Sequence, residues 1–504
     1  MARQLASGSF GSTELRAWCD AHAAVPENDK QVFVLHYEVD DTDTKKDPLY
    51  IVLLSNKFNL NKLRLVRSLQ ADATHKMIRD QKKVLVAGSS DANKKFHGIV
   101  VGAASNENEW AYVRLFQAFL KWMPNWSPEA VMADGASYIT NAVKTVFPTA
   151  QRLMCFFHVT TNLRFRIFKG RTRCCWKKIN QLVDDIQLAQ SKDEFAVLTP
   201  LFRGKVEELQ IKFPELDIDY IMSWFSGTLS LWFENGTSHS YCMTNNGLEA
   251  TNGVISKEHT ENQVHSLDDW LAIGIDIVKD WTDNLPPFAE KPSPPSDAQL
   301  MEAYQVFRTF EDNLEEVDGD ANKQEDEKKK KNENNEEKFL LIRANMNINE
   351  PLLAEERASG KWTKFEHFQC CIENVWLLTV TPSTVRCTCR EGSKKKLCVH
   401  SIAMEHKLGR RLIPDTLQSV PLVSRANPGR KRRNGKAWSF ITSQTPATVS
   451  EPRTENDQTP IQGVLQPIAT AVVEKRKRGR PPKQTQPNQP EPVPKRGRGR
   501  PRKN

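Results

Sequence analysis

Short runs of apolar residues, separated by polar segments, mark the first third of the chain. Four of these runs have the length and the branched side chains that are typical of strands. They span residues 31–37, 50–55, 83–88 and 97–104. Between residues 107 and 123 the apolar positions recur instead at the spacing of a helix. Strands and helices mixed in this way predict α/β architecture for residues 30–300, after an N-terminal segment of residues 1–29.

The pattern changes along the rest of the chain. Residues 160–240 carry tryptophan and leucine at helical spacing, which predicts a helical region inside the first domain. Residues 311–338 are almost all charged or polar and predict a linker, because such a segment has little to bury. A second, small folded unit is expected at residues 339–415. Residues 416–504 are rich in proline, glutamine, threonine and basic residues, and we expect them to be disordered.

Composition and charge indicate the redox compartment of the protein and the class of its partner. The chain has 504 residues, of which 39% are hydrophobic, enough for about two or three domains with real cores. Its ten cysteines are too few and too clustered for a disulfide scaffold, which favours a reducing compartment. We find no secretory signal and no apolar run of about 18 residues, so no membrane partner is expected. Residues 425–504 hold 19 lysines and arginines against 5 acids, a net charge of +14, and the remainder carries −5 of the total of +9. Such a basic tail indicates an anionic partner, most often nucleic acid.

Four potential metal ligands lie close together near residue 390. They are two tight pairs in the sequence RCTCREGSKKKLCVH, formed by Cys387, Cys389, Cys398 and His400. Zinc prefers four thiolate or imidazole ligands in a tetrahedral arrangement, and a closed set of four protein ligands is structural rather than catalytic. The spacing resembles that of the SWIM zinc finger, a short ββα module. We therefore expect a structural zinc ion in a module whose core spans residues 380–410, and a chance cluster of cysteines is the alternative.

Three acidic residues stand where strands end or where a helix begins. Asp72 ends an apolar strand, Asp134 ends a short strand before a glycine, and Glu249 lies on a helix that follows good capping residues. Carboxylates at such positions could converge to hold two Mg²⁺ or Mn²⁺ ions for phosphoryl transfer. Each acid taken singly also fits a simpler interpretation, as a turn residue or as a charge that stabilises the start of a helix.

The segments around these acids resemble those of the Mutator-like element (MULE) transposases. The resemblance rests on QADATHKM with Asp72, MADGASYITNAVKTVFP with Asp134, CFFH with Cys155 and His158, and TNNGLEATNGVISKE with Glu249 and Asn252. A SWIM finger downstream of the catalytic domain is also the usual arrangement in this family. The resemblance covers roughly residues 30–410, and the order of its parts makes it more specific than any single motif.

The resemblance implies a fold, an activity and a set of roles. The fold is an RNase H-like DDE catalytic domain at residues 30–300, with a helical insertion at about 160–240. In that fold Asp72 lies on the central first strand, Asp134 on the fourth strand and Glu249 on the closing helix. The three acids would bind Mg²⁺ or Mn²⁺ and catalyse DNA strand cleavage and transfer. Support of the active site is implied for three further residues, Cys155, His158 and Asn252, although core packing at a strand end also explains the first two.

One departure from the family concerns the start of the chain. MULE transposases usually begin with a zinc-binding DNA-recognition domain. Residues 1–29 offer only Cys19 and His22 as ligands, so we expect no such finger within them. A truncated gene model, a degenerate element and a protein adopted for another use remain open as explanations.

Two short basic motifs occupy the tail, at residues 477–483 and 496–503. They share an Arg-Gly-Arg-Pro centre, formed by Arg478, Gly479, Arg480 and Pro481 and again by Arg498, Gly499, Arg500 and Pro501. Glycine lets the backbone approach the floor of a narrow A·T minor groove, and proline keeps the chain extended, so the motifs resemble AT-hooks. A nuclear-import signal is the alternative, and both interpretations predict a nuclear protein. A third basic cluster at residues 429–436 lacks proline and indicates import or phosphate contact.

Three functions remain in competition at this point. The first is a DDE-type transposase that carries out DNA transposition, and the intact acids favour it. The second is a non-catalytic DNA-binding or chromatin regulator derived from such an enzyme, which the AT-hooks and the absent N-terminal finger favour. A zinc-stabilised interaction scaffold is the third. DNA is the expected partner, as A·T-rich duplex for the tail and as transposon ends for a mobile element, and homo-oligomer formation stays open.

Overall fold

The structure is a computed structural model that describes residues 10–42, 48–235, 243–317, 336–343 and 350–418. The chain divides into two units, Met1–Ser424 and Arg425–Asn504. Both AT-hook-like motifs and the third basic cluster lie outside the described residues, as does most of the charged segment 311–338. Among the helices that are described, none has the length and apolar character needed to cross a bilayer.

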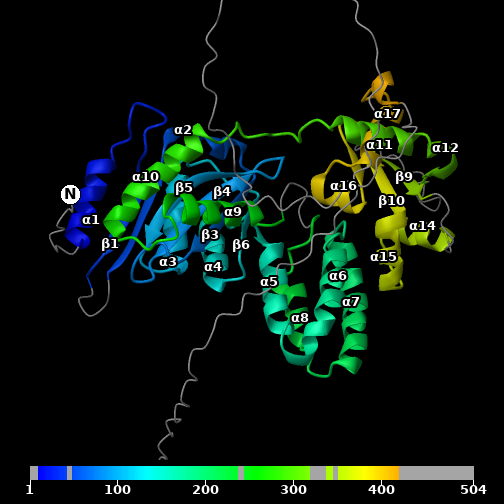
Figure 1. The fold of residues 1–504 in the computed structure, drawn as a ribbon, viewed down its shortest axis with the longest axis horizontal. Coiled ribbons are helices and arrows are strands. Elements are labelled where there is room, and N and C mark those ends of the chain that lie inside the picture. The colour runs from blue at the N-terminus through cyan, green and yellow to red at the C-terminus, as the bar shows by residue number, and fades with distance from the viewer. Residues whose placement is uncertain (1–9, 43–47, 236–242, 318–335, 344–349, 419–504) are drawn as a thin grey trace, which may run out of the picture. The chain divides into compact units, whose positions relative to one another are not determined.

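A seven-stranded mixed sheet forms the centre of the N-terminal part (Figure 1). Its strands are β1 (Phe33–Asp40), β2 (Leu49–Ser55), β3 (Ser68–Thr74), β4 (Lys83–Ser90), β5 (Phe96–Ala104), β6 (Ala130–Ala133) and β7 (Gln151–Met154). They lie in the order β1-β2-β5-β4-β3-β6-β7. Strand β6 runs parallel to β3 and β7, whereas the other neighbours are antiparallel. The four strands predicted from the apolar runs correspond to β1, β2, β4 and β5, and the α/β class is confirmed.

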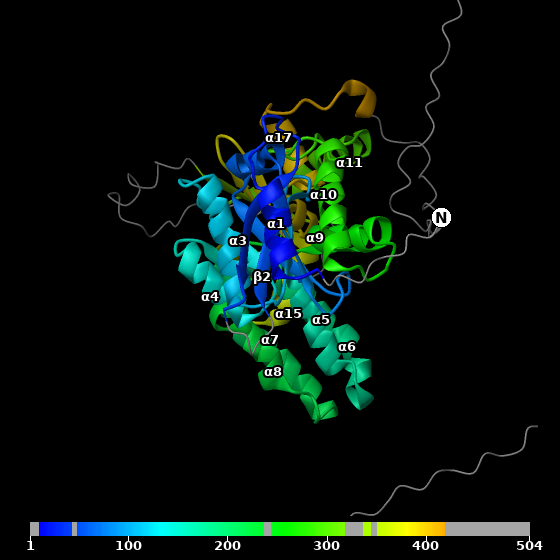
Figure 2. The ribbon, with the colours of Figure 1, turned by 90° about the vertical axis from the view of Figure 1, so that its left-hand side faces the viewer.

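Helices cover both faces of this sheet, because the side chains of its central strands alternate between two cores. On β2, Ile51 and Leu53 belong to one core, and Val52 and Leu54 belong to the other. The first core includes α3 (Glu109–Trp122) and α4 (Ser137–Val146), and the second includes α1 (Ser12–His22), α9 (Asn246–Val254) and α10 (Leu267–Asp283). Figure 2 shows α3 and α10 on opposite sides of β2. A strand that is buried on both faces is a continuous apolar run in the sequence, which is why these strands were predictable.

A helical region follows β7 and separates it from α9. Its helices are α5 (Phe156–Ile167), α6 (Trp176–Ile186), α7 (Lys192–Lys212) and α8 (Ile218–Met222). Ser191 caps α7, because its side chain accepts a hydrogen bond from the backbone of Glu194. Other short segments are α2 (Lys57–Asn61), α12 (Phe310–Asn313), the π-helical turn Ile255–His259, and 3₁₀ turns at Lys62–Leu65, Gly170–Cys175, Ser223–Phe225, Gly227–Leu229 and Asp415–Leu417. We call α5–α8 the helical region below.

A four-stranded sheet organises the C-terminal part of the described chain. Its order is β11-β10-β9-β8, and all neighbours are antiparallel. The strands are β8 (Leu314–Glu316), β9 (Glu337–Ile342), β10 (Val375–Val380) and β11 (Val385–Cys387), and the helices are α11 (Asp297–Phe307), α14 (Glu350–Ser359), α15 (Phe365–Asn374), α16 (Arg390–Lys395) and α17 (Val399–Lys407). Ala303 of α11 shares a core with Ile402 of α17. The C-terminal fold therefore includes α11, which lies upstream of residue 339.

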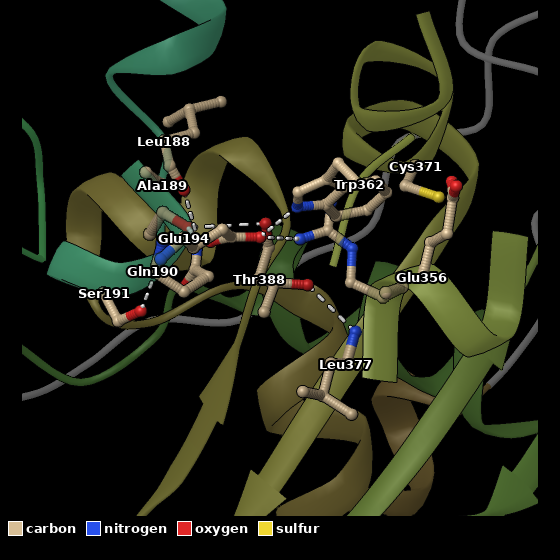
Figure 3. A network of polar contacts seen from close by, with 12 residues as sticks. Leu188, Ala189, Gln190, Ser191, Glu194, Glu356, Trp362, Cys371, Leu377 and Thr388 are labelled. Atoms are coloured by element: carbon tan, nitrogen blue, oxygen red, sulfur yellow. Dashed lines mark hydrogen bonds and ion pairs between the residues drawn. The ribbon is translucent and has the colours of Figure 1, made fainter. Parts of the chain in front are cut away.

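The helical region and the C-terminal part share one hydrophobic core. This core joins Leu198 and Phe202 of α7 to Phe365 and Phe368 of α15. A buried polar network crosses the same boundary: Glu194 accepts a hydrogen bond from the Trp362 indole at 2.8 Å, and the two side chains face each other in Figure 3. The helical region precedes the charged segment 311–338, and most of the C-terminal part follows it. These two parts therefore contact each other through buried side chains.

Candidate functional site

Asp72 and Asp134 occupy corresponding positions on neighbouring parallel strands. Gln70 of β3 is paired with Met132 of β6. Side chains alternate along a strand, so two residues further on the same face of the sheet presents Asp72 and Asp134. Asp72 still pairs with Val86 of β4, whereas Asp134 directly follows the last residue of β6. The register therefore brings two carboxylates side by side where β6 ends.

The turn after β6 fixes the position of Asp134. Its Oδ1 accepts a hydrogen bond from the backbone N–H of Ala136 at 3.0 Å. Below it, the buried guanidinium of Arg152 donates to the main-chain carbonyl groups of Ala133, Leu153 and Asp134. Burial lowers the pKa of Arg152 to about 10, although the charge of Asp134 acts in the opposite direction. Sequence reasoning missed Arg152, and the signal was a lone basic residue within an apolar strand.

Helix α9 brings Glu249 and Asn252 to the same place. The two residues are three positions apart and therefore share one helix face. The Asn252 amide donates a hydrogen bond to Oδ2 of Asp72 at 3.1 Å. At the start of the helix, the backbone N–H of Glu249 donates to the carbonyl of Asn245 at 2.8 Å. The third acid thus comes from a helix that is hydrogen-bonded directly to the strand that carries the first.

Burial and neighbouring acids raise the proton affinity of Asp72, and burial raises that of Glu249. Burial, and next the charges of Asp134, Glu249 and Glu107, raise the pKa of Asp72 to about 8. Burial also raises the pKa of Glu249 to about 7. Carboxylates that are desolvated and crowded in this way resist ionisation unless a cation offsets their charge. We call Asp72, Asp134, Glu249 and Glu107 the acid site.

Glu107 was not predicted from the sequence, where it simply precedes a helix. In the structure its carboxylate accepts a hydrogen bond from the Tyr138 hydroxyl at 2.9 Å and lies 3.5 Å from Nε2 of His75. Only 14% of its side chain is exposed. Its place beside the acid site follows from the packing of α3 against α4, and no local pattern in the sequence indicates it.

Cys155 and His158 also lie at this site, next to Glu249. Donor atoms of Cys155, His158 and Glu249 lie within 4.8 Å of one another. Nε2 of His158 is 3.6 Å from Oε1 of Glu249, and the backbone N–H of Asn245 donates to the Cys155 sulfur at 3.1 Å. Among the described residues, Asp72, Asp134 and Glu249 do not form an equally tight group. Glu249 is therefore close to the Cys–His pair while it still acts electrostatically on Asp72.

The comparison with known proteins agrees with this geometry. Residues 68–162 match the family model of the MULE transposase domain. Residues 68–162 carry a MULE transposase domain. The match includes Asp72, Asp134, Cys155 and His158 and ends before Glu249, and the family expected from the sequence motifs is confirmed. No curated protein matches the chain.

Several polar atoms around the acid site have no hydrogen-bond partner within the described part of the chain. They are Nδ1 of His158, Oε1 of Glu249, Oδ1 of Asn252, and both side-chain atoms of Asn245. Unpaired buried polar atoms cost about 1–3 kcal/mol each. Such a site is suited to a bound ion or ligand that satisfies these atoms, and its carboxylates suit divalent cations that prefer oxygen.

The second group of potential ligands lies in the C-terminal part of the described chain. Donor atoms of Cys387, Cys389, Cys398 and His400 all lie within 4.8 Å of one another. Nδ1 of His400 is 3.6 Å from the sulfur of Cys387 and 4.0 Å from that of Cys398. Donor atoms around a tetrahedral zinc ion are about 3.3–3.8 Å apart, as follows from bond lengths of about 2.0–2.3 Å. The four residues predicted from the sequence therefore come together and can hold a zinc ion.

The local backbone supports thiolates at this second group. Backbone N–H groups of Cys389, Gly392 and Ser401 point at the sulfurs of Cys387, Cys389 and Cys398, at 3.4, 3.1 and 3.4 Å respectively. Position 392 has to be glycine, because a Cβ there would lie 2.5 Å from the carbonyl oxygen of Cys387. The fourth ligand is oriented by stacking, since the His400 ring lies 4.0 Å from the ring of Trp376. These supports agree with a closed, structural metal site.

Proposed function

We propose that this chain is a DNA transposase, or an enzyme derived from one, that cleaves and joins DNA strands at the acid site. The observation that carries the proposal is the register that places Asp72 and Asp134 on neighbouring strands, with Glu249 on a helix tied to Asp72 through Asn252. The MULE match over residues 68–162 supports the same activity independently. The proposed reaction is hydrolysis of a DNA phosphodiester that frees a 3′-hydroxyl, which then attacks target DNA.

An RNase H-like fold for the N-terminal part belongs to this proposal. If β3 is taken as the first strand, Asp72 lies on the first strand and Asp134 follows the fourth, β6. The first strand is central, between β4 and β6. Helix α9 then closes the site after the helical region. The order of elements therefore agrees with the arrangement that the family resemblance implies.

The residues of the acid site have separate tasks in this reaction. Asp72, Asp134 and Glu249 would hold Mg²⁺ or Mn²⁺, which would offset phosphate charge and make a bound water a better nucleophile. Asn252 orients the Asp72 carboxylate through its hydrogen bond. Burial lowers the pKa of His158, so its imidazole is neutral at pH 7 and a ring nitrogen can accept a proton near Glu249. As water adds to phosphorus, the P–O3′ bond breaks and the leaving oxygen takes up a proton.

The C-terminal part and the tail are proposed to provide structure and DNA affinity. We propose a SWIM-type zinc module, because its four ligands come together around β11, α16 and α17. Cys387 ends β11, Cys389 precedes α16, and Cys398 and His400 lie at the start of α17. We also propose that the Arg-Gly-Arg-Pro motifs of the tail bind the minor groove of A·T-rich DNA in the nucleus. These two functions do not require the acid site to be active.

A non-catalytic DNA-binding regulator is the second candidate. One observation favours it, because Glu249 groups with Cys155 and His158 more tightly than with the two aspartates. In such a protein the acids would serve the fold only. The two candidates differ in a single property, which is metal-dependent cleavage of DNA.

A strand-nicking assay distinguishes the two candidates. Full-length protein is incubated with Mn²⁺ or Mg²⁺ and with DNA that flanks the coding sequence, and the new ends are tested for a 3′-hydroxyl. Asp72→Asn, Asp134→Asn and Glu249→Gln should each lower nicking by about 100-fold or more while thermal unfolding shows a retained fold. The matched control is Asp276→Asn, since that exposed carboxylate on α10 pairs with Lys279 on the surface. No nicking by the parent, or nicking by the three variants at the parent's rate, would reject the catalytic proposal.

A further inference from the structure

Cys155, His158 and Glu249 form a group of mixed donors that the proposed DNA cleavage does not require as a unit. One thiol, one imidazole and one carboxylate each place a donor atom within 4.8 Å of the other two. The three come from two elements: Cys155 precedes α5 and His158 lies in its first turn, whereas Glu249 lies on α9. In the described residues, this is one of two groups in which three or more such donors meet.

We propose that this group is a second metal site, which takes one thiophilic divalent cation of the zinc class. Thiolate and imidazole donors favour Zn²⁺ and related ions, whereas Mg²⁺ and Mn²⁺ prefer a set made of oxygens. The site is therefore distinct in chemistry from the all-carboxylate set of the acid site. It is also distinct from the cluster around Cys387, which uses other residues in another part of the fold.

The geometry requires little movement for binding. A tetrahedral zinc ion holds its donor atoms about 3.3–3.8 Å apart. Nε2 of His158 and Oε1 of Glu249 are already 3.6 Å apart. The largest separation within the group, up to 4.8 Å, has to close by roughly 1 Å, which a side-chain rotation can supply.

The surroundings prepare the donors for an ion. The backbone N–H of Asn245 points at the Cys155 sulfur at 3.1 Å and would stabilise a thiolate there. Oε1 of Glu249, the atom that lies 3.6 Å from Nε2 of His158, is buried and has no hydrogen-bond partner among the described residues. An ion at this group would satisfy that carboxylate oxygen, and this is the second observation that indicates a ligand.

Two members of the group are partly exposed to solvent. The side chains of His158 and Glu249 are 24% and 23% exposed, while Cys155 is fully buried. Three protein donors and one open position are the arrangement of an exchangeable zinc site, in contrast to the closed set of four ligands near residue 390. We therefore expect weaker binding here than at Cys387, Cys389, Cys398 and His400, with water as the fourth ligand.

The second site would share Glu249 with the acid site. An ion at Cys155 and His158 would draw on the same carboxylate that the proposed cleavage uses, so zinc-class ions should compete with Mn²⁺ for it. This consequence depends on the proposed function. Binding of the ion does not, because it can be measured in the absence of DNA and of catalysis.

Metal content of the full-length protein tests the proposal. The chain is equilibrated with excess Zn²⁺, free ions are removed by rapid gel filtration, and bound zinc is measured by mass spectrometry of the metal. We expect two ions per chain for the parent and one for Cys155→Ser. Cys175→Ser is the matched control and should keep two, because that buried thiol lies outside both groups and donates to the Thr172 carbonyl, a bond that a serine hydroxyl can also make.

Co²⁺ supplies a second measurement that does not depend on the fold of a cysteine variant. The second equivalent of Co²⁺ should give a thiolate charge-transfer band, and Glu249→Gln should weaken binding of that equivalent by about 10-fold or more. A parent chain that binds a single thiophilic ion would overturn the proposal. So would two ions of unchanged affinity in both Cys155→Ser and Glu249→Gln, since the second ion would then lie elsewhere.

Discussion

The side-chain amide of Asn252 donates a hydrogen bond to Oδ2 of Asp72 across 3.1 Å, and these residues are 180 positions apart in the sequence. This bond connects α9, which carries Glu249, to the strand that carries the first acid. It leaves the Asn252 carbonyl oxygen buried and without a partner among the described residues. The helix is therefore held at the acid site by a contact that also fixes the orientation of a carboxylate.

Replacement of Asn252 by alanine should impair nicking without removing it. The Asp72 carboxylate would lose its orienting donor but keep its charge, so we expect about a 10-fold lower rate, less than the loss caused by Asp72→Asn. The half-saturating Mn²⁺ concentration should rise, whereas a purely structural role would leave it unchanged. Titration of nicking against Mn²⁺ measures this difference. Thr251→Ala in the same helix turn serves as control, since the Thr251 hydroxyl donates to the Gly247 carbonyl and not to an acid.

Removal of zinc from the C-terminal group should loosen the helical region as well. Residues between the ligands hold that region: Arg390 pairs with Asp185 at 2.7 Å, and Lys396 donates to Asn235 at 2.9 Å. After Cys389→Ser, amide hydrogen exchange should rise about 10-fold or more in α16 and α6, but not in β2 or β5.

Lys395→Ala is the control for this experiment. Its side chain lies on α16, is 63% exposed and pairs with Glu391 on the surface. Exchange in α6 should stay at the parent's rate in this variant. Faster exchange confined to α16 and α17 after Cys389→Ser would show that the zinc module does not support the helical region.

The tail should bind A·T-rich duplex with an affinity that falls as salt rises. Each phosphate that the tail neutralises adds about −0.9 to the slope of log K against log salt. Alanine at Arg478, Arg480, Arg498 and Arg500 should abolish the preference for A·T over G·C duplex, measured by fluorescence anisotropy. Alanine at Lys431, Arg432 and Arg433 is the control, which should reduce the salt slope but keep the preference for A·T duplex. If the variant with alanine at the four motif arginines still prefers A·T duplex, the AT-hook interpretation is wrong.

Loss of the proton from Lys62 at high pH should increase the free energy of unfolding. Its side chain is 8% exposed, and burial lowers its pKa to about 8. Below that value both folded and unfolded forms carry the proton, and the folded form bears the cost of a buried charge. Between about pH 8 and 10.5 the unfolded chain binds more protons, so stability rises with pH.

Lys62→Met removes this titration and isolates its contribution. At pH 7 the variant should be more stable than the parent by roughly 1–3 kcal/mol. The Lys62 ammonium donates a hydrogen bond to Oδ1 of Asn59 at 2.7 Å, and the loss of this bond reduces the gain in stability. The difference should shrink towards zero above about pH 10. Urea unfolding at pH 7 and pH 10 measures it, and a difference that does not change with pH would contradict the buried charge.

Local sequence was sufficient to predict an element or a site wherever a single property of one segment determines it. β2 and β5 were predictable as continuous apolar runs because both of their faces are covered. The zinc ligands Cys387, Cys389, Cys398 and His400 were predictable as a group because a short segment of the chain separates the two pairs. Local sequence did not predict the roles of Glu107 and Arg152 or the core that the helical region shares with the C-terminal part. Each of these depends on a partner that is distant along the chain.

The sequence by itself determined the α/β class, the family motifs, and which acids and thiols are available for chemistry. Only the tertiary structure decided how they combine. The register of β3 with β6 places Asp72 beside Asp134, and the docking of α9 sets Glu249 between that pair and His158. Motif spacing cannot give such distances, because they are set by packing between segments that the chain joins only through the long helical region, and packing energy depends on every side chain at the contact.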